Sequence, residues 1–279
     1  MRKIYLFTLV ALFSTFIFSC NKEKSATDTT PEPPVVTNDS DATKFIQIAQ
    51  IADTSQKQAI QSLVKQLKDS ALWSKFMAIY PFVGGTENST KINLKDPRDM
   101  DEAFRITFHG NPVIGATGVL FPTTADYADT HFYDSLLTFN DNSISYFSRT
   151  QNTVSGYDMG CNDWIAPYNE MTIYNETNAS DYFGFNIFGN KPANTKGLFM
   201  FSATTTNVTW FENGVQKLEK GSVPVNKFTA APILIGWCQN ADAGGQRECA
   251  FSTIGKGFSA TEALTLNNIV TNFEAALKR

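Results

Sequence analysis

Histidine is nearly absent from this sequence, which contains only His109 and His131 among 279 residues. The chain has no His-Glu-x-x-His zinc helix, no Gly-x-Ser-x-Gly turn and no glycine-rich phosphate loop. It also lacks the Glu-x-Asp-x-x-Glu pattern that would place two carboxylates in a glycosidase cleft. No motif therefore predicts catalysis, and we expect both histidines to have ordinary hydrogen-bonded roles.

Positive charge is also scarce. The chain has 23 Lys and Arg residues against 27 Asp and Glu, a formal net charge of -4, and it contains no basic run. Nucleic-acid affinity comes largely from Lys and Arg contacts with phosphates. This composition excludes nucleic acid as a partner.

A hydrophobic run long enough to span a membrane is missing. The apolar run 4–18 follows Arg2 and Lys3, and it is shorter than the roughly 20 residues that a membrane helix needs. Ser19 and Cys20 end the run, a pattern typical of a lipoprotein signal peptide, so we expect residues 1–19 to be removed. Acylation of Cys20 would then hold the mature protein on a membrane. We expect it to lie in a bacterial cell envelope, anchored by lipid in the outer membrane.

Two segments precede the main domain. Residues 20–41 are rich in Thr, Ser, Asp and Pro and have too few apolar residues for a core, which predicts a disordered tether that begins at the lipidated cysteine. Residues 42–80 show apolar positions at helical spacing, and Ser55 with Gln58 fits a capping box. The pattern predicts a helical hairpin over 42–80.

From residue 81 the apolar period changes from 3.6 to 2. Phe104, Ile106 and Phe108 alternate with polar residues, and several short runs of the same kind follow. Asn213-Gly214 predicts a tight hairpin turn, and Ser259 with Glu262 predicts the start of a final helix. Aromatic residues make up 13% of the chain, which suits a wide apolar core. Residues 81–279 are therefore expected to form a mainly β, antiparallel sandwich closed by a helix.

Three cysteines remain after the signal is removed: Cys161, Cys238 and Cys249. Cys238 and Cys249 flank a polar stretch between two apolar runs, so they could face each other across a hairpin and form a disulfide in an oxidising compartment. The alternative is two buried thiols. Cys161 is expected to be an unpaired, partly buried thiol.

Two blocks of sequence resemble a known family. They are 60–80, with Leu63, Leu67 and Leu72-Trp73, and 249–259, followed by Glu262 and Leu266. Between them, 127–132, 146–149 and 210–215 are similar to that family's sandwich entry, its next core strand and its Asn-Gly hairpin. Residues 45–279 thus resemble the concanavalin A-like (laminin G-like) jelly roll of phage tail and host-recognition proteins and bacterial surface lipoproteins. The resemblance implies no catalytic residues, and 161–164 depart from the family's usual plain turn.

Two loop clusters combine aromatic rings with amides or carboxylates, the groups that sugar recognition uses. The first comprises Asn162, Asp163, Trp164, Tyr168 and Asn169, and the second Trp237, Gln239, Asn240 and Asp242. The alternative is that Trp164 closes a core edge and Trp237 belongs to a central strand. Calcium needs several oxygen ligands in one loop, and Asp141, Asn142 and Asp242 are too few to predict a site, so no cofactor is expected.

These observations predict a membrane-anchored surface lipoprotein that acts as a non-catalytic module and binds a glycan or a surface protein. One alternative is a glycan-degrading enzyme, a glycosidase or lyase, on the same fold. Another is a purely structural envelope protein.

The lipid anchor has a direct test. Cys20→Ser removes the acylated sulfur, so we expect the variant to lose labelling by a radioactive or clickable fatty acid and to appear in soluble fractions or unprocessed. Fractionation and labelling of whole cells measure both. Membrane retention of a processed Cys20→Ser protein would contradict lipidation at this residue.

Overall fold

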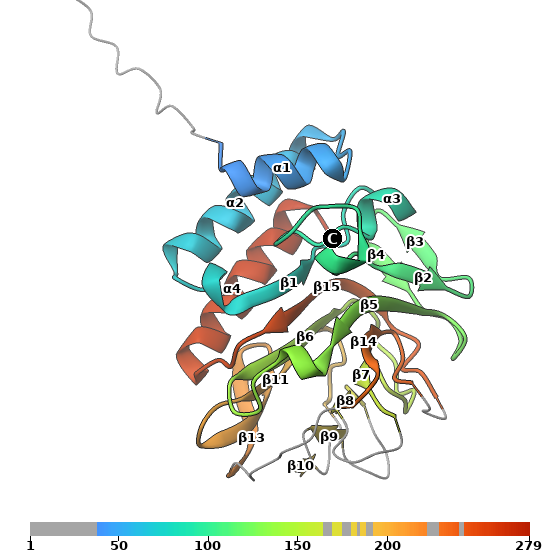
Figure 1. Cartoon of the computed structure of the whole chain (residues 1–279), viewed down its shortest axis with the longest axis vertical. Helices are drawn as coiled ribbons and strands as arrows, with labels where there is room; N and C mark the ends of the chain where they lie inside the picture. The colour runs from blue at the N-terminus through green and yellow to red at the C-terminus, as the bar shows by residue number, and fades with distance from the viewer. Residues whose placement is uncertain are drawn as a thin grey trace, which may run out of the picture. The chain divides into compact units, whose positions relative to one another are not determined.

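The computed structural model describes residues 38–163, 169–174, 180–182, 185–187, 192–221, 229–239 and 243–279. The segment Asn38–Arg279 forms one compact unit. Two antiparallel sheets lie face to face, and helices cover one of them (Figure 1). This arrangement confirms the prediction of a mainly β, antiparallel sandwich with a helix at its C-terminus.

The larger sheet, sheet A, has eight strands in the order β13-β12-β11-β6-β15-β4-β3, with β1 paired to β15. Its strands are β1 (Phe76–Tyr80), β3 (Val113–Gly115), β4 (Gly118–Leu120), β6 (Asn142–Ser148), β11 (Gly197–Ala203), β12 (Asn207–Glu212), β13 (Val215–Gly221) and β15 (Glu248–Gly255). One edge of β15 serves two partners in succession, since Cys249 pairs with Val119 of β4 and Thr253 pairs with Ile79 of β1. The strand that follows the helical segment is thereby joined to the sandwich.

The smaller sheet, sheet B, has seven strands in the order β10-β9-β8-β7-β14-β5-β2. Its strands are β2 (Thr107–His109), β5 (Tyr127–Tyr133), β7 (Met159–Cys161), β8 (Asn169–Met171), β9 (Ser180–Tyr182), β10 (Phe185–Ile187) and β14 (Pro232–Ile235). Inward side chains of both sheets form the inter-sheet core, with Phe132, Tyr146 and Trp210 among the largest.

Sheet A is apolar on both faces. Phe199 and Phe201 of β11 pack in the inter-sheet core, whereas Leu198 and Met200 pack in a second core beneath the helices. Successive residues of a strand point to opposite faces, so a strand buried on both sides appears in the sequence as an unbroken apolar run. This explains why 198–201 lacks polar alternation.

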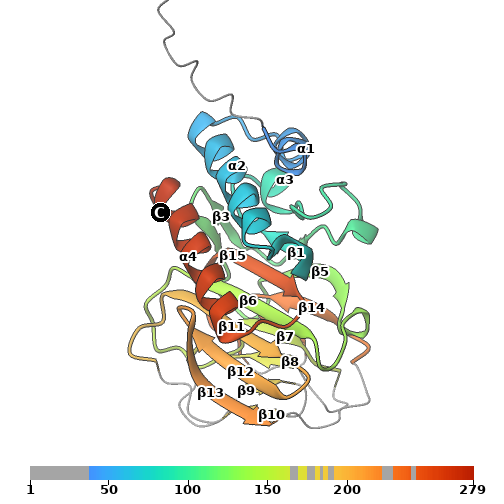
Figure 2. The ribbon, with the colours of Figure 1, turned by 90° about the vertical axis from the view of Figure 1, so that its left-hand side faces the viewer.

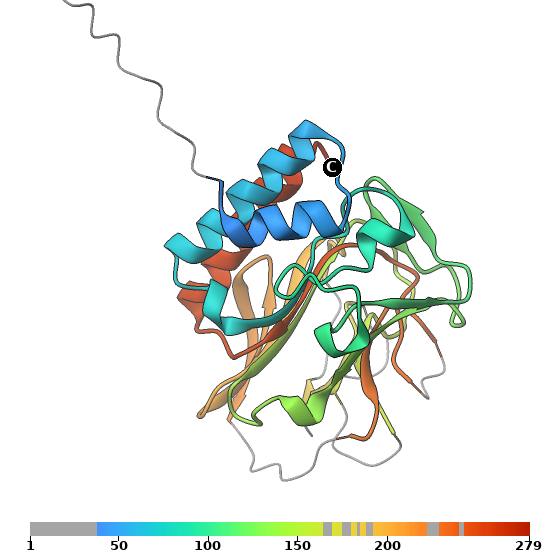
Figure 3. The same cartoon turned by 45° about the horizontal axis from the view of Figure 1, so that its top comes forward.

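The helices cover the outer face of sheet A (Figures 2 and 3). They are α1 (Ser40–Ile48), α2 (Thr54–Asp69), the short α3 (Glu87–Thr90) and α4 (Ala260–Ala276), with the 3-10 turn η1 (Trp73–Lys75). Two further 3-10 turns, η2 (Asp101–Ala103) and η3 (Asp134–Leu136), lie next to β5 of sheet B. α2 packs on α4, and both contribute to the second core. Among the helices of the described segments, none is long and apolar enough to cross a membrane.

Capping motifs in the sequence predicted one helix start correctly and one incorrectly. The capping box of Ser259 and Glu262 is present at the start of α4, as predicted. The start of α2 was predicted two residues too late, because Asp53 is the N-cap and its side chain accepts from the backbone N–H of Gln56. An aspartate is as good a cap as a serine, so the sequence offered two competing start positions.

The predicted Asn-Gly hairpin is confirmed. Asn213 and Gly214 join β12 to β13 with φ angles of 52° and 75°. The left-handed conformation costs glycine little, and asparagine tolerates it better than most residues. The Asn213 side chain adds a further bond, because its Oδ1 accepts from the backbone N–H of Leu198 at 3.0 Å.

The structure contradicts the expected Cys238–Cys249 disulfide. All three cysteines described are buried thiols without a disulfide. Cys238 follows β14 in sheet B and Cys249 lies in β15 of sheet A, so the two cysteines do not face each other across a hairpin. Burial raises the pKa of each thiol well above its ordinary value, which keeps the sulfurs protonated and unreactive.

A buried ion pair ties the two sheets together. Asp158 precedes β7 of sheet B, and Arg247 precedes β15 of sheet A. Nη1 of Arg247 donates to both carboxylate oxygens of Asp158 at 3.0 and 3.1 Å, and both side chains are 0% exposed. The same carboxylate accepts from the backbone N–H of Ile173, and Nη2 of Arg247 donates to the carbonyl of Val154.

We predict that Arg247→Met destabilises the fold by about 3 to 5 kcal/mol, because it leaves the Asp158 carboxylate buried without a counter-charge. Urea unfolding at neutral pH measures the loss. The double variant Arg247→Met/Asp158→Leu should recover much of it, since no buried charge then remains. A single variant that loses less than about 1 kcal/mol would show that this pair does not hold the sheets together.

Candidate ligand-binding face

The face of sheet B that points away from sheet A, called here the outer face, is partly exposed. Along β5 the side chains of Ala128, Thr130 and Phe132 are fully buried, whereas Tyr127 and Asp129, which alternate with them, are partly exposed. The two-residue period of the strand therefore presents one set of β5 side chains to the inter-sheet core and the other to the outer face.

Three aromatic rings lie side by side on the outer face. His109 of β2 is the cross-strand partner of Tyr127, and their rings stack with centroids 4.6 Å apart and planes at 13°. Trp237 continues the row, since its ring centroid is 5.4 Å from that of Tyr127. All three side chains are partly exposed. We call His109, Tyr127 and Trp237 the aromatic row.

Gly236 brings Trp237 into this row. It follows the last residue of β14 and has a φ of 90°, a conformation that favours glycine. A Cβ atom at this position would also clash with the ring of Phe121, which is buried in the inter-sheet core. The turn at Gly236 redirects the chain directly after the strand, so that Trp237 contacts Tyr127.

Asp126 fixes the entry to β5 beside the aromatic row. Its carboxylate accepts from the backbone N–H groups of Asn111 and Thr123 at 2.6 and 2.9 Å, and from the Thr123 hydroxyl at 2.6 Å. Burial alone would raise the pKa of Asp126, but these hydrogen bonds outweigh it and hold the pKa below its usual range. The loop that positions Tyr127 is thereby fixed by an ionised carboxylate at neutral pH.

A bulge in β5 places His131 next to the aromatic row. Pro232 of β14 pairs with Tyr133 and Leu234 pairs with Asp129, so three residues of β5 lie opposite one residue of β14. His131 lies within the bulge and has a φ of 53°, which is uncommon for a residue with a Cβ atom. Bulges of this kind redirect side chains and are frequent beside functional sites.

The bulge is held by polar contacts. The backbone N–H of His131 donates to Oδ1 of Asp129 at 2.7 Å, and its Nε2 lies 2.8 Å from the hydroxyl of Thr107. Nε2 is also 3.5 Å from a carboxylate oxygen of Asp101. The outer face therefore combines the aromatic row with a hydroxyl, an imidazole and carboxylates.

The carboxylates of Asp129 and Glu170 lie far apart on this face. Asp129 pairs with Leu234, Leu234 with Gly160, and Gly160 with Glu170, so the two acids face the same side of the sheet. β14 and β7 lie between their strands, which at a strand spacing of about 4.8 Å separates their backbones by roughly 14 Å. Glu170 is buried, and its Oε1 accepts from the Asn162 amide at 2.6 Å.

The residues predicted to bind a ligand fall into different environments. Asn162 lies beside Glu170, and Asp163 accepts from the backbone N–H of Ala230 at 2.7 Å. Asn169 instead pairs with Cys161 and points into the interior, where its amide donates to Asp134. Trp237 is the predicted residue that joins the aromatic row. Trp164, Tyr168, Asn240 and Asp242 lie outside the described residues.

Sequence reasoning missed His109 and Tyr127 as functional candidates. Tyr127 was assigned to a strand entry and His109 to an ordinary hydrogen-bonded role, and they are separated by 17 intervening residues in the sequence. Alternation along 127–133 could have placed Tyr127 and Asp129 on one face. The pairing of β2 with β5 that brings His109 to Tyr127 has no local signal.

No site for a metal ion emerges from the described residues. They contain no group of three His, Cys, Asp or Glu side chains arranged to hold an ion. Asp141 and Asn142, considered above for calcium, serve the loop itself, because Asp141 accepts from the backbone N–H of Gly257 and the Asn142 amide donates to two carbonyls.

Comparison with known proteins gives distant matches of architecture. No family model matches the chain, and no curated protein matches its sequence. Domain 4 of an extracellular GH43 arabinanase from Geobacillus stearothermophilus, in complex with arabinotriose, is 17% identical with a TM-score of 0.42, over 69% of this chain and 98% of that chain. A Trypanosoma rangeli sialidase in complex with sialic acid is 9% identical with a TM-score of 0.46, over 75% of this chain and 38% of that one.

The ligand-binding domain of botulinum neurotoxin serotype D, in complex with N-acetylneuraminic acid, is 9% identical with a TM-score of 0.43, over 71% of this chain and 52% of that one. This chain thus spans about half of the toxin domain and less of the sialidase. Likenesses this distant carry no argument about activity, which has to rest on the residues of the outer face. The resemblance to phage tail proteins stays a prediction.

Asp134, the partner of Asn169, occupies an unusual position. It follows β5 at the start of η3 and is fully buried. Its Oδ2 accepts from the Asn169 amide at 2.6 Å and from the backbone N–H of Thr229 at 3.2 Å, while Oδ1 has no hydrogen-bond partner. Burial raises the pKa of the carboxyl above its ordinary value of 3.8, and hydrogen bonds from Thr229, Cys161 and Asn169 offset only part of that rise.

This arrangement predicts the pH dependence of Asp134→Asn. Protonated Asp134 contributes stability below its unfolded pKa, and that contribution is lost as pH rises through the higher folded pKa. Asparagine stays neutral and keeps an oxygen acceptor, so the variant should gain stability relative to the wild type between pH 4 and pH 7.5. Urea unfolding at both pH values measures the difference, with Asp69→Asn, at an exposed carboxylate of α2, as control. A variant that loses stability equally at both values would contradict the raised pKa.

Proposed function

We propose that this chain is a lipid-anchored protein of a bacterial cell envelope whose sandwich binds a glycan without cleaving it. The observation that carries the binding half of the proposal is the aromatic row on the outer face of sheet B. His109 and Tyr127 cover part of each other's ring faces, and the partly exposed remainder of the row, including Trp237, offers an apolar surface on which a sugar ring can pack. The lipid anchor rests on the sequence from Arg2 to Cys20.

Polar groups beside the row supply what hydroxyl recognition needs. Asp129 has a side chain that is 20% exposed and can accept hydrogen bonds, and Thr107 and His131 lie next to it on the same face. Binding sites commonly combine an apolar wall with a few fixed polar groups that set orientation. The contacts of Asp126 and the bulge hold these groups in place before a ligand arrives, which lowers the entropic cost of binding.

The separation of Asp129 from Glu170 argues against cleavage by that pair. A glycosidase pair is about 5 to 5.5 Å apart for retention or about 6.5 to 9.5 Å apart for inversion. Asp129 and Glu170 are separated by two intervening strands, and Glu170 is buried against Asn162. A glycan-degrading enzyme is the second candidate function, and a protein ligand is a further alternative to a glycan.

We predict that Trp237→Ala and Tyr127→Ala each weaken glycan binding by at least tenfold, because each removes a ring of the row, and aromatic hot spots commonly contribute about 2 kcal/mol or more. The measurement is a glycan array on the purified protein, followed by calorimetry with the best ligand. Trp73→Ala is the matched control, since Trp73 is a partly exposed tryptophan on the helical side of sheet A and should leave affinity unchanged.

Four outcomes would contradict the proposal or part of it. Equal loss of affinity in Trp73→Ala would point to a global effect rather than to the aromatic row. Unchanged affinity in both row variants would place the ligand elsewhere. Release of reducing sugar by the wild type would make the protein an enzyme. A drop in melting temperature without loss of affinity would return Trp237 to a purely structural role.

A further inference from the structure

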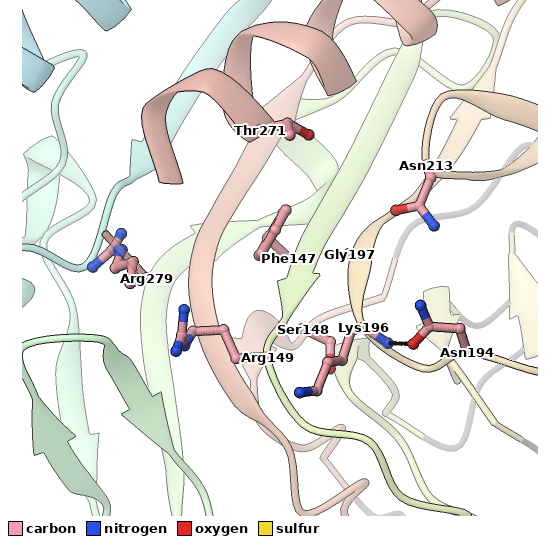
Figure 4. A pocket seen from close by; sticks show the side chains of 9 residues that line it. All are labelled: Phe147, Ser148, Arg149, Asn194, Lys196, Gly197, Asn213, Thr271 and Arg279. Carbon is pink, nitrogen blue, oxygen red and sulfur yellow. Dashed lines mark hydrogen bonds between the residues drawn. The ribbon is translucent and has the colours of Figure 1, made fainter. Parts of the chain in front are cut away.

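A cleft of about 470 Å³ lies on the helix-covered side of sheet A, away from the aromatic row on sheet B. Figure 4 shows it from close by. It opens on the helix-covered face of sheet A, between the end of β6, the start of β11 and α4. Its walls are formed by Phe147, Ser148, Arg149, Asn194, Lys196, Gly197, Asn213, Thr271 and Arg279. Three of these nine residues are cationic and none is acidic.

Arg149 forms a long ion pair with Glu248, and among the described residues its guanidinium donates no hydrogen bond. Its side chain is 25% exposed, and the nearest carboxylate oxygen, Oε1 of Glu248, lies 3.6 Å from its Nε. That Nε is buried and has no hydrogen-bond partner. Within the described parts of the chain, no group accepts a hydrogen bond from the guanidinium. An arginine fork in this state can receive a planar or tetrahedral oxyanion.

Lys196 supplies a second available cation. Its side chain is exposed, and no carboxylate of the described segments forms an ion pair with it. The backbone around it is fixed, because its N–H donates to Oδ1 of Asn194 at 3.0 Å (Figure 4). Lys196 and Arg149 thus enter one cleft from the adjacent strand ends of β11 and β6.

Arg279 differs from these two cations because its guanidinium is ion-paired with Glu274 at close range. Its guanidinium donates to both carboxylate oxygens of Glu274 and to the carbonyls of Pro81, Phe82 and Ala250. It therefore shapes the cleft wall and neutralises Glu274. The positive charge that remains for a ligand comes from Lys196 and from Arg149, whose ion pair with Glu248 is long at 3.6 Å.

The neutral polar groups of the cleft are donors as well. Oδ1 of Asn194 and Oδ1 of Asn213 each accept a backbone N–H, from Lys196 and Leu198 respectively. Each amide therefore keeps its NH₂ group for another partner. Phe147 adds an apolar surface between them, since it is only partly buried beside the second core.

We propose that this cleft is a second binding site, which takes an oxyanion carried on a sugar-sized ring, such as a uronic acid or a sulfated monosaccharide. Two available cations and two amide donors suit the charged group, and Phe147 suits the ring. The volume falls within the range of small-molecule sites. The site is separate from the aromatic row and does not depend on the function proposed for that row.

The test uses the full-length chain in detergent at low ionic strength, because surface charge is screened by salt. Calorimetry compares D-glucuronate, glucose 6-sulfate, glucose and inorganic sulfate. We expect at least one sugar anion to bind at least tenfold more tightly than glucose or inorganic sulfate. Whichever of D-glucuronate and glucose 6-sulfate binds more tightly shows whether the site prefers a carboxylate or a sulfate ester. Arg149→Gln and Lys196→Gln should each weaken that binding by about tenfold, one charge-assisted contact being lost in each.

One control separates this site from other effects. Lys65→Gln removes an exposed cation from α2 and should leave the affinity unchanged. Binding of inorganic sulfate as tightly as of the sugar anions would mean an adventitious ion only and would overturn the proposal. Equal affinity of Lys196→Gln, Arg149→Gln and the wild type would also overturn it, as would the absence of any anion binding.

Discussion

Burial of sheet A on both faces is the constraint on which the rest of the structure depends. Phe199 and Phe201 face sheet B while Leu198 and Met200 face the helices, and each such side chain contributes about 1.5 to 3 kcal/mol when fully buried. α2 and α4 are needed to cover the outward set. The central strands of sheet A are enclosed between helices and sheet B, whereas the outer face of sheet B stays partly exposed. The aromatic row lies on that surface.

Irregular backbone gives this surface its chemical character. A regular β5 would pair residue by residue with β14, but the bulge at His131 moves an imidazole beside Thr107 and Asp101. Gly236 similarly turns the chain at the end of β14 so that Trp237 contacts Tyr127. Both features carry positive φ angles, which the surrounding hydrogen bonds and packing have to maintain. The regular strands provide the platform, and the two irregular positions provide side chains at its surface.

Buried polar groups divide into two kinds in this protein. The Asp158–Arg247 pair is satisfied on the carboxylate side and joins the two sheets. Asp134 has one oxygen without a partner, and burial raises its pKa. Burial raises the pKa of Asp158 as well, but its pair with Arg247 stabilises a unique packing of sheet on sheet when both partners are present, whereas Asp134, with its unpartnered oxygen, imposes a cost that depends on pH. The sequence did not mark Asp158 or Asp134 as buried, because the residues next to a buried aspartate along the chain can be the same as those next to an aspartate in an exposed loop.

The amino-acid sequence by itself determined the features that depend on a few neighbouring residues. Asn213-Gly214 produced its hairpin, Ser259 with Glu262 began the last helix, and period-2 runs became strands of an antiparallel sandwich. Predictions from the sequence were wrong where the structure depends on which distant segments pair with each other. Cys238 and Cys249 looked like two sides of a hairpin, but Cys238 follows a strand of sheet B and Cys249 lies in sheet A. Asn169 points inward although Asn162, seven residues earlier, bonds to Glu170. Only the tertiary structure decided these placements and the meeting of His109, Tyr127 and Trp237. Turns and caps are fixed by short-range hydrogen bonds, whereas strand order and sidedness are fixed by which apolar faces the whole chain can bury at once.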